Sequence, residues 1–259
     1  MIRTVTATRY VTPLREGGSL PGLVEADDDG LYVVKFRGAG QGPRALVAEW
    51  LAGELARAVG LPVPDLVAVE VAENLGDAEP DEEIQDLVRA SAGRNLGLDF
   101  LPGALPFNPA ARPEVDPAMA AATVWLDAFV TNPDRTVANP NLLVWHGRIW
   151  CIDHGAALYI HHSWRDADEH ALRPFERSAS HVLLPYAASI RDADARVAGM
   201  IDAEAITALV DAIPDVWLTD DPIVGDAAAQ RLAYRRYLER RLTAPRAFVE
   251  EAERARSAA

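Results

Sequence analysis

Short runs of apolar and β-branched residues, separated by Gly, Pro and Asp, dominate the first hundred positions of the chain. Runs of this length are typical of strands, and the separating residues are typical of turns. We expect five strands, at residues 3–11, 23–26, 31–36, 66–71 and 96–101. One helix should lie between Pro43 and about Val59, because proline suits a first helical turn and Gly60 suits a helix end. Residues 72–83 are acidic and are expected to be exposed.

Longer apolar patterns with helical spacing prevail in the second part of the chain. We expect helices at 117–130, near 181–190, at 202–213, at 225–242 and after Pro245. A polar loop at 131–141 leads into a short hairpin made of residues 142–145 and 148–152. The pattern predicts an α+β fold with two lobes. Residues 1–103 form a small antiparallel β-rich lobe with one helix, and residues 104–259 form a larger, mainly helical lobe.

Charge and composition exclude several classes of function. The formal net charge is −14, which argues against a nucleic-acid partner, because neutralising phosphates needs a basic surface. No apolar run is long enough for a membrane span, and the first residues lack the apolar core of a signal peptide, so a cytoplasmic protein is predicted. The single cysteine, Cys151, excludes an internal disulfide and a multi-cysteine zinc site.

Lysine is almost absent from this arginine-rich chain. Of the 25 lysine and arginine residues, only Lys35 is lysine, and it lies in the apolar run 31–36. An ammonium is a compact point charge, whereas a guanidinium is a wide planar fork, so the two are not interchangeable in a narrow site. A cation in a buried strand also needs a partner of opposite charge. The sequence therefore marks Lys35 as a candidate functional residue with an acidic partner.

A second group of candidate residues lies in the polar loop and at the end of the hairpin. The loop contains Asp134, Asn139 and Asn141, and the hairpin ends at Asp153. Because a hairpin returns the chain to its start, Asp153 should lie near Asn139 and Asn141. Carboxylate and carboxamide oxygens are hard ligands that suit Mg²⁺.

The order of these motifs resembles that of the HipA-like and phosphatidylinositol 3-/4-kinase-like branch of the protein-kinase-like superfamily. Asp134-Arg135 followed by Asn139 resembles the catalytic loop, and Asp153-His154-Gly155 stands in the place of Asp-Phe-Gly. The run from Val59 to Pro64 resembles the end of the helix that follows the strand lysine in HipA-like proteins. The resemblance covers roughly residues 14–160 and implies a protein-kinase-like two-lobed fold that binds ATP and Mg²⁺.

Nucleotide-binding roles follow from the resemblance. Lys35 would contact the α- and β-phosphates, and a glutamate of the next helix would pair with it. The family pattern places this glutamate at Glu49, 11 residues before Gly60, while Glu54 remains the alternative. The phosphate-covering loop and the linker that faces the adenine would include Gly17, Gly18, Ser19, Leu101 and Gly103.

Catalytic and metal-binding roles follow in the same way. Asp134 would orient or deprotonate the acceptor hydroxyl, and Arg135 would pair with a phosphate or with a nearby carboxylate. Asn139 and Asp153 would hold Mg²⁺ on the nucleotide, with Asn141 as the alternative to Asn139. The sequence thus predicts an Mg-dependent ATP phosphotransferase whose acceptor is a protein Ser/Thr. A nucleotide-binding pseudokinase and a kinase for a small molecule or lipid remain alternatives.

Overall fold

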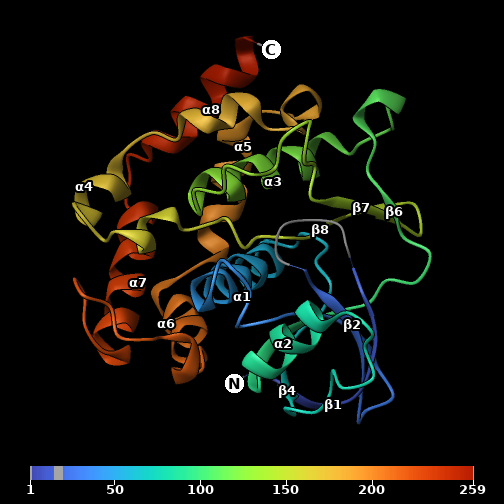
Figure 1. Cartoon of the computed structure of the whole chain (residues 1–259). Coiled ribbons are helices and arrows are strands. Elements are labelled where there is room, and N and C mark those ends of the chain that lie inside the picture. Colours follow the sequence, from blue (N-terminus) through green and yellow to red (C-terminus); the bar gives the residue numbers. More distant parts are fainter. Residues whose placement is uncertain (1, 15–19, 259) are drawn as a thin grey trace.

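The computed structural model describes residues 2–14 and 20–258, and it has a β-rich part followed by a helical part (Figure 1). The expected α+β, kinase-like arrangement is confirmed. All five expected strands are present, and each lies within about three residues of its expected bounds. The elements of the first part are β1 (Thr4–Pro13), β2 (Gly22–Ala26), β3 (Leu31–Lys35), α1 (Pro43–Ala58), β4 (Leu66–Val71), α2 (Glu82–Ala90) and β5 (Gly93–Asp99).

The strands close into a barrel in the order β1-β2-β3-β5-β4. All neighbouring pairs are antiparallel except β1 and β4, which pair in parallel where Thr4–Thr6 lies beside Ala68–Glu70. This pair differs from the expected all-antiparallel sheet. Valines of β2, β3 and β4 fill the interior, and Gly97 is required there, because a Cβ atom would lie 2.6 Å from the Val69 side chain.

Helix α2 was not predicted, because it is short and its acidic residues make the helical spacing of its apolar positions hard to recognise. Only Ile84 and Val88 of this helix are buried, and they pack against the barrel interior cluster. The carboxylate of Asp81 caps the first turn by accepting a hydrogen bond from the Glu83 amide. Two apolar residues four positions apart are enough to dock a helix of two turns.

Helix α1 lies between the barrel and the helical part, and most of its length is buried. Gly53 allows a close approach to the sheet, because a Cβ atom there would lie 2.6 Å from the Leu66 side chain. The apolar residues of α1 belong to the same core as those of the helical part, whereas the barrel interior forms a separate cluster. Helix α1 is therefore held from both sides.

The helical part contains the expected hairpin of β7 (Leu142–Trp145) and β8 (Arg148–Cys151), and the short strand β6 (Leu105–Pro106) pairs with β7 to make a three-stranded sheet. The prediction of a helix near 181–190 is wrong. That segment holds one 3₁₀ turn, Leu184–Tyr186, and α5 begins only at Ile190. Pro185 removes a backbone donor there, and the Ser189 hydroxyl caps α5. The helices are α3 (Pro117–Phe129), α4 (Ala167–Leu172), α5 (Ile190–Val197), α6 (Ala203–Asp211), α7 (Ala227–Leu242) and α8 (Ala247–Ala258).

Within the described ranges, none of the helices is long and apolar enough to cross a membrane. The expected cytoplasmic location stays a prediction, as does the division of the chain at residue 103.

Candidate active site

Lys35 lies at the end of β3 and joins three segments of the chain. Its Nζ atom lies 2.6 Å from Oε2 of Glu49 on α1 and 2.5 Å from Oδ1 of Asp153, which follows β8. Burial alone would lower the pKa of Lys35, but the two carboxylates outweigh it and raise this pKa above its ordinary value of 10.5. The ammonium is therefore charged, and it ties the barrel to α1 and to the hairpin.

The partner of Lys35, which the sequence left open, is Glu49 in the structure. The Glu49 side chain is fully buried, and although burial would raise its pKa, the charge of Lys35 lowers it below the ordinary 4.5. Glu54 lies on another face of α1 and contacts Arg57, with 3.5 Å between Oε1 and Nε. Five residues turn a helix through about 500°, so the two glutamates cannot face the same strand.

His154 is a buried neighbour of this pair that the sequence did not assign to the site. Its Nδ1 atom lies 3.5 Å from Oε1 of Glu49, and both side chains are fully buried. Among the described residues, neither ring nitrogen has a hydrogen-bond partner, and neither does Oε1 of Glu49. Its position directly after Asp153 was the only signal in the sequence.

The loop between α3 and β7 gathers Asp134 and two asparagines. Oδ2 of Asp134 accepts hydrogen bonds from Nδ2 of Asn139 (2.8 Å) and from Nδ2 of Asn141 (3.2 Å). Nδ2 of Asn141 also donates to the backbone carbonyl of Asp153 at 3.4 Å. Asn141 and Asp153 both have positive φ angles, 48° and 55°, which side-chain-bearing residues rarely adopt. The expected proximity of the loop and Asp153 is thus present.

These contacts leave oxygen atoms suited to a divalent cation. Because both asparagines direct their amino groups at Asp134, their Oδ1 atoms receive no hydrogen bond from any described residue. Asp153 adds carboxylate oxygens, so the donor set is hard and fits Mg²⁺. In the described part of the chain, no three His, Cys, Asp or Glu side chains converge, so a zinc-type cluster is not formed there.

Arg135 is paired with a nearby carboxylate, one of the two kinds of partner that the sequence allowed. Its side chain is fully buried, and Nε donates to Oδ2 of Asp127 at 2.6 Å. Its Nη1 donates to the carbonyls of Asn141 and Ile152. Arg135 therefore connects the Asp134 loop to the residue before Asp153.

The buried carboxylate of Asp127 contacts both Arg135 and His181. His181 accepts the Leu183 amide at Nδ1, so its Nε2 atom donates to Asp127 at 2.9 Å. Burial would raise the pKa of Asp127, but the charge of Arg135 and the hydrogen bond from His181 lower it well below its ordinary value. An aspartate inside the apolar pattern 117–130 was a signal for this role, whereas nothing in the sequence marked His181.

The remaining predicted residues are those of the phosphate-covering loop and of the adenine-facing linker. Gly17, Gly18 and Ser19 lie outside the described residues. Leu101 and Gly103 lie in a turn between β5 and β6, where the Leu101 carbonyl accepts the Ala104 amide. A small cavity beside Lys35 and Asp153 is lined by Ala39, Gln41 and Gly42 and by the start of α1.

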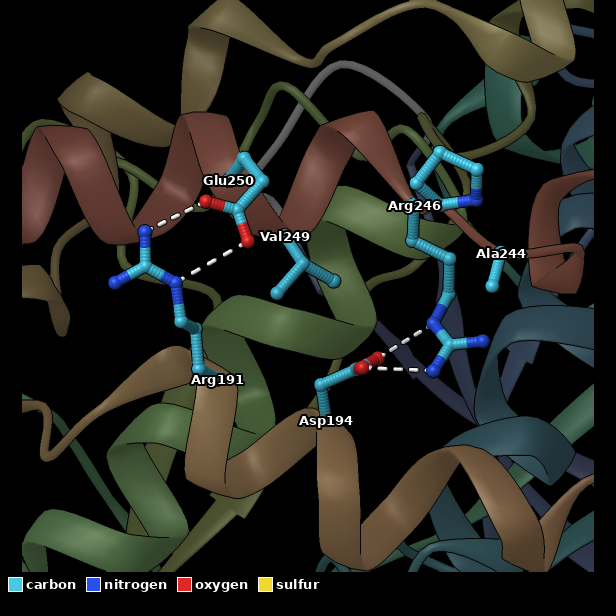
Figure 2. A pocket seen from close by; sticks show the side chains of 7 residues that line it. Arg191, Asp194, Ala244, Arg246, Val249 and Glu250 are labelled. Atoms are coloured by element: carbon cyan, nitrogen blue, oxygen red, sulfur yellow. Dashed lines mark hydrogen bonds and ion pairs between the residues drawn. The ribbon is translucent and has the colours of Figure 1, made fainter.

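A larger hollow lies elsewhere, between α5 and α8 (Figure 2). Its four charged side chains form two pairs, Arg191 with Glu250 and Arg246 with Asp194. Because each of these four charges is already paired, this hollow offers a ligand no free charge.

Comparisons with known proteins identify the family and the fold of the chain. A family model described as HipA-like kinase matches residues 8–245. Thus the similarity extends well beyond the residues 14–160 covered by the motifs. The search of curated proteins found no match.

Solved structures with a similar fold include the Helicobacter pylori proinflammatory kinase CtkA, with 14% identity and a TM-score of 0.56 over 98% of this chain and 99% of that chain. The Golgi casein kinase is 15% identical, with a TM-score of 0.47 over 98% of this chain and 72% of that chain. These identities are low, and the first match shows the fold alone.

Proposed function

The chain belongs to the HipA-like kinase family, and we propose that it is a competent Mg-dependent kinase that transfers the γ-phosphate of ATP to a hydroxyl group. One observation carries this proposal. Lys35, Glu49 and Asp153 meet at one point, and Asn141 connects Asp134 to the backbone of Asp153. A pseudokinase has no need to keep all of these groups, and here none has been replaced.

Lys35 binds the α- and β-phosphates in this proposal, and Glu49 holds the ammonium in place. Asp153 would hold the cation together with Oδ1 of Asn139 or of Asn141. When bound, Mg²⁺ neutralises the charge that develops on the phosphate oxygens. Lys35 then exchanges its contact with Asp153 for one with phosphate, which costs little because the Asp153 side chain is 45% exposed.

Asp134 orients the acceptor hydroxyl and accepts its proton. Two amide groups donate to Oδ2, which fixes the direction of the carboxylate. Arg135 acts through the backbone: by bonding the carbonyls of Asn141 and Ile152, it keeps Asp134 and Asp153 at a constant separation.

We propose protein Ser/Thr as the acceptor class. The loop that carries Asp134 is at the surface, and Val137 within it is 66% exposed. An exposed loop with an apolar side chain can be approached by a peptide segment, whereas a small-molecule kinase usually encloses its acceptor in a pocket. Small-molecule and lipid acceptors are the alternatives.

The test is incubation of the purified chain with Mg²⁺ and γ-labelled ATP, alone and with a cell extract. We expect a labelled protein band that is lost in Asp134→Asn. A labelled small molecule would instead support the alternative acceptors. ATP binding by calorimetry with no transfer under any of these conditions would contradict the proposal and indicate a pseudokinase.

A further inference from the structure

Helix α1 carries Glu49, so the position of this helix decides whether Lys35 keeps its partner. In the structure, two contacts with the helical part flank Glu49. Near the start of α1, Arg44 forms an ion pair with Asp221, which lies 177 residues further along the chain. Directly beside Glu49, the indole of Trp50 donates to the carbonyl of Leu209 on α6 at 3.0 Å.

Asp221 is held in place by further hydrogen bonds within its own turn. The carboxylate is 3% exposed, and its Oδ1 atom also accepts the amides of Ile223 and Val224 at 2.8 and 2.9 Å. The buried side chain of Gln230, on α7, donates to the carbonyls of Thr219 and Gly225 and so holds both ends of the same turn. Arg44 is therefore bound to a carboxylate that is itself held by hydrogen bonds within its turn.

A third contact joins the barrel itself to this region. The indole of Trp217, just before the turn, donates to the Arg94 carbonyl of β5 at 2.9 Å. Strand β5 is hydrogen-bonded to β3, which carries Lys35. The segment from Leu209 to Asp221 thus holds both the helix of Glu49 and the sheet of Lys35.

We infer that Arg44 and Asp221 are positioning residues for the Lys35–Glu49 pair, so that the C-terminal helical part keeps the phosphate-binding site assembled. This inference rests on the proposed function for its effect on phosphate transfer. Its structural effect on Lys35 is independent of that function and can be measured separately.

The single lysine of the chain makes the exposure of Lys35 measurable by chemical labelling. Because Lys35 is the only lysine, an amine-acylating reagent followed by peptide mapping reports on this one side chain. In the assembled state the Lys35 side chain is 12% exposed and its ammonium contacts both Glu49 and Asp153, so it reacts slowly. Displacement of α1 separates Glu49 from Lys35 and increases the rate of acylation.

Asp221→Asn is the sharpest variant, because its amide oxygen can still accept the Ile223 and Val224 amides while the charge facing Arg44 is lost. Arg44→Gln breaks the same pair from the other side. We expect acylation of Lys35 to rise and kcat for transfer to fall, each about fivefold, the population shift that follows loss of one partly buried ion pair. The double variant should be no worse than either single variant.

Arg236→Gln is the matched control, since it breaks the exposed Arg236–Asp168 pair away from α1 and should change neither quantity. Unchanged Lys35 acylation in both Asp221→Asn and Arg44→Gln, with melting temperatures like that of the wild type, would overturn the inference. If the wild-type chain transfers no phosphate but acylation responds as expected, the positioning role stands and the proposed function fails.

Discussion

The Lys35–Glu49 pair allows the effect of one substitution to be worked out in free energy. Lys35→Met removes the ammonium and leaves Glu49, whose side chain is fully buried, without its ion-pair partner. Removing one partner of a buried ion pair costs about 3–5 kcal/mol. Asp153 adds little to this cost, because its side chain is 45% exposed and water replaces the lost contact. For a chain of this size, we expect the melting temperature to fall by about 10 °C.

The stability lost in Lys35→Met is expected to depend on pH, because the substitution changes the pKa of Glu49. In the wild type, the pKa of Glu49 is lowered below 4.5, so its contribution to stability is complete above that pH and is lost as the pH falls through the folded-state pKa. Without Lys35, the effect of burial dominates and raises the pKa of Glu49. The variant then takes up a proton more readily when folded, so it is least stable relative to the wild type near neutral pH and approaches the wild type on acidification.

Scanning calorimetry of four proteins tests this reasoning. Lys35→Met/Glu49→Gln should recover more than half of the lost stability at neutral pH, because no unpaired charge remains buried. Glu54→Gln is the control on the same helix, and its loose contact with Arg57 predicts a change within about 0.5 kcal/mol. A neutral-pH melting temperature for Lys35→Met equal to the wild type, or a deficit that grows on acidification, would refute the argument.

Three further substitutions test other parts of the site. Asp153→Asn should weaken Mg-ATP binding about tenfold or more in calorimetry, because a hard anionic ligand is lost; an unchanged affinity would remove Asp153 from the metal site. Asp127→Asn leaves the buried Arg135 without its counter-charge and should cost about 3 kcal/mol in urea unfolding; a change near zero would mean that Arg135 is not held by this pair. Arg241→Met should cost about 2–4 kcal/mol, because this buried guanidinium caps the carbonyls of Ala128 and Phe129 at the end of α3; wild-type stability would show that the cap is dispensable.

Local patterns were sufficient for most strands and for the choice of candidate site residues. Strand β3 was predictable because residues 31–34 form a short apolar, β-prone run directly after the turn at residues 27–30. The spacing from Asp134 to Asn139 and the hairpin before Asp153 were also local signals, since a hairpin brings its two ends together wherever it is placed. Helix α2 and the segment around Pro185 were mistaken, because a short element depends on what it packs against more than on its own pattern.

The sequence by itself identified the candidate residues: a single lysine in an apolar strand, and a loop of hard oxygen donors before a hairpin. Only the tertiary structure decided how they are supported. It paired Lys35 with Glu49 and not with Glu54, buried Arg135 against Asp127, and brought Asp221 to Arg44 across 177 residues. The physical reason is that residue type sets what a side chain can bind, whereas burial and pairing depend on contacts between segments that are distant in the chain.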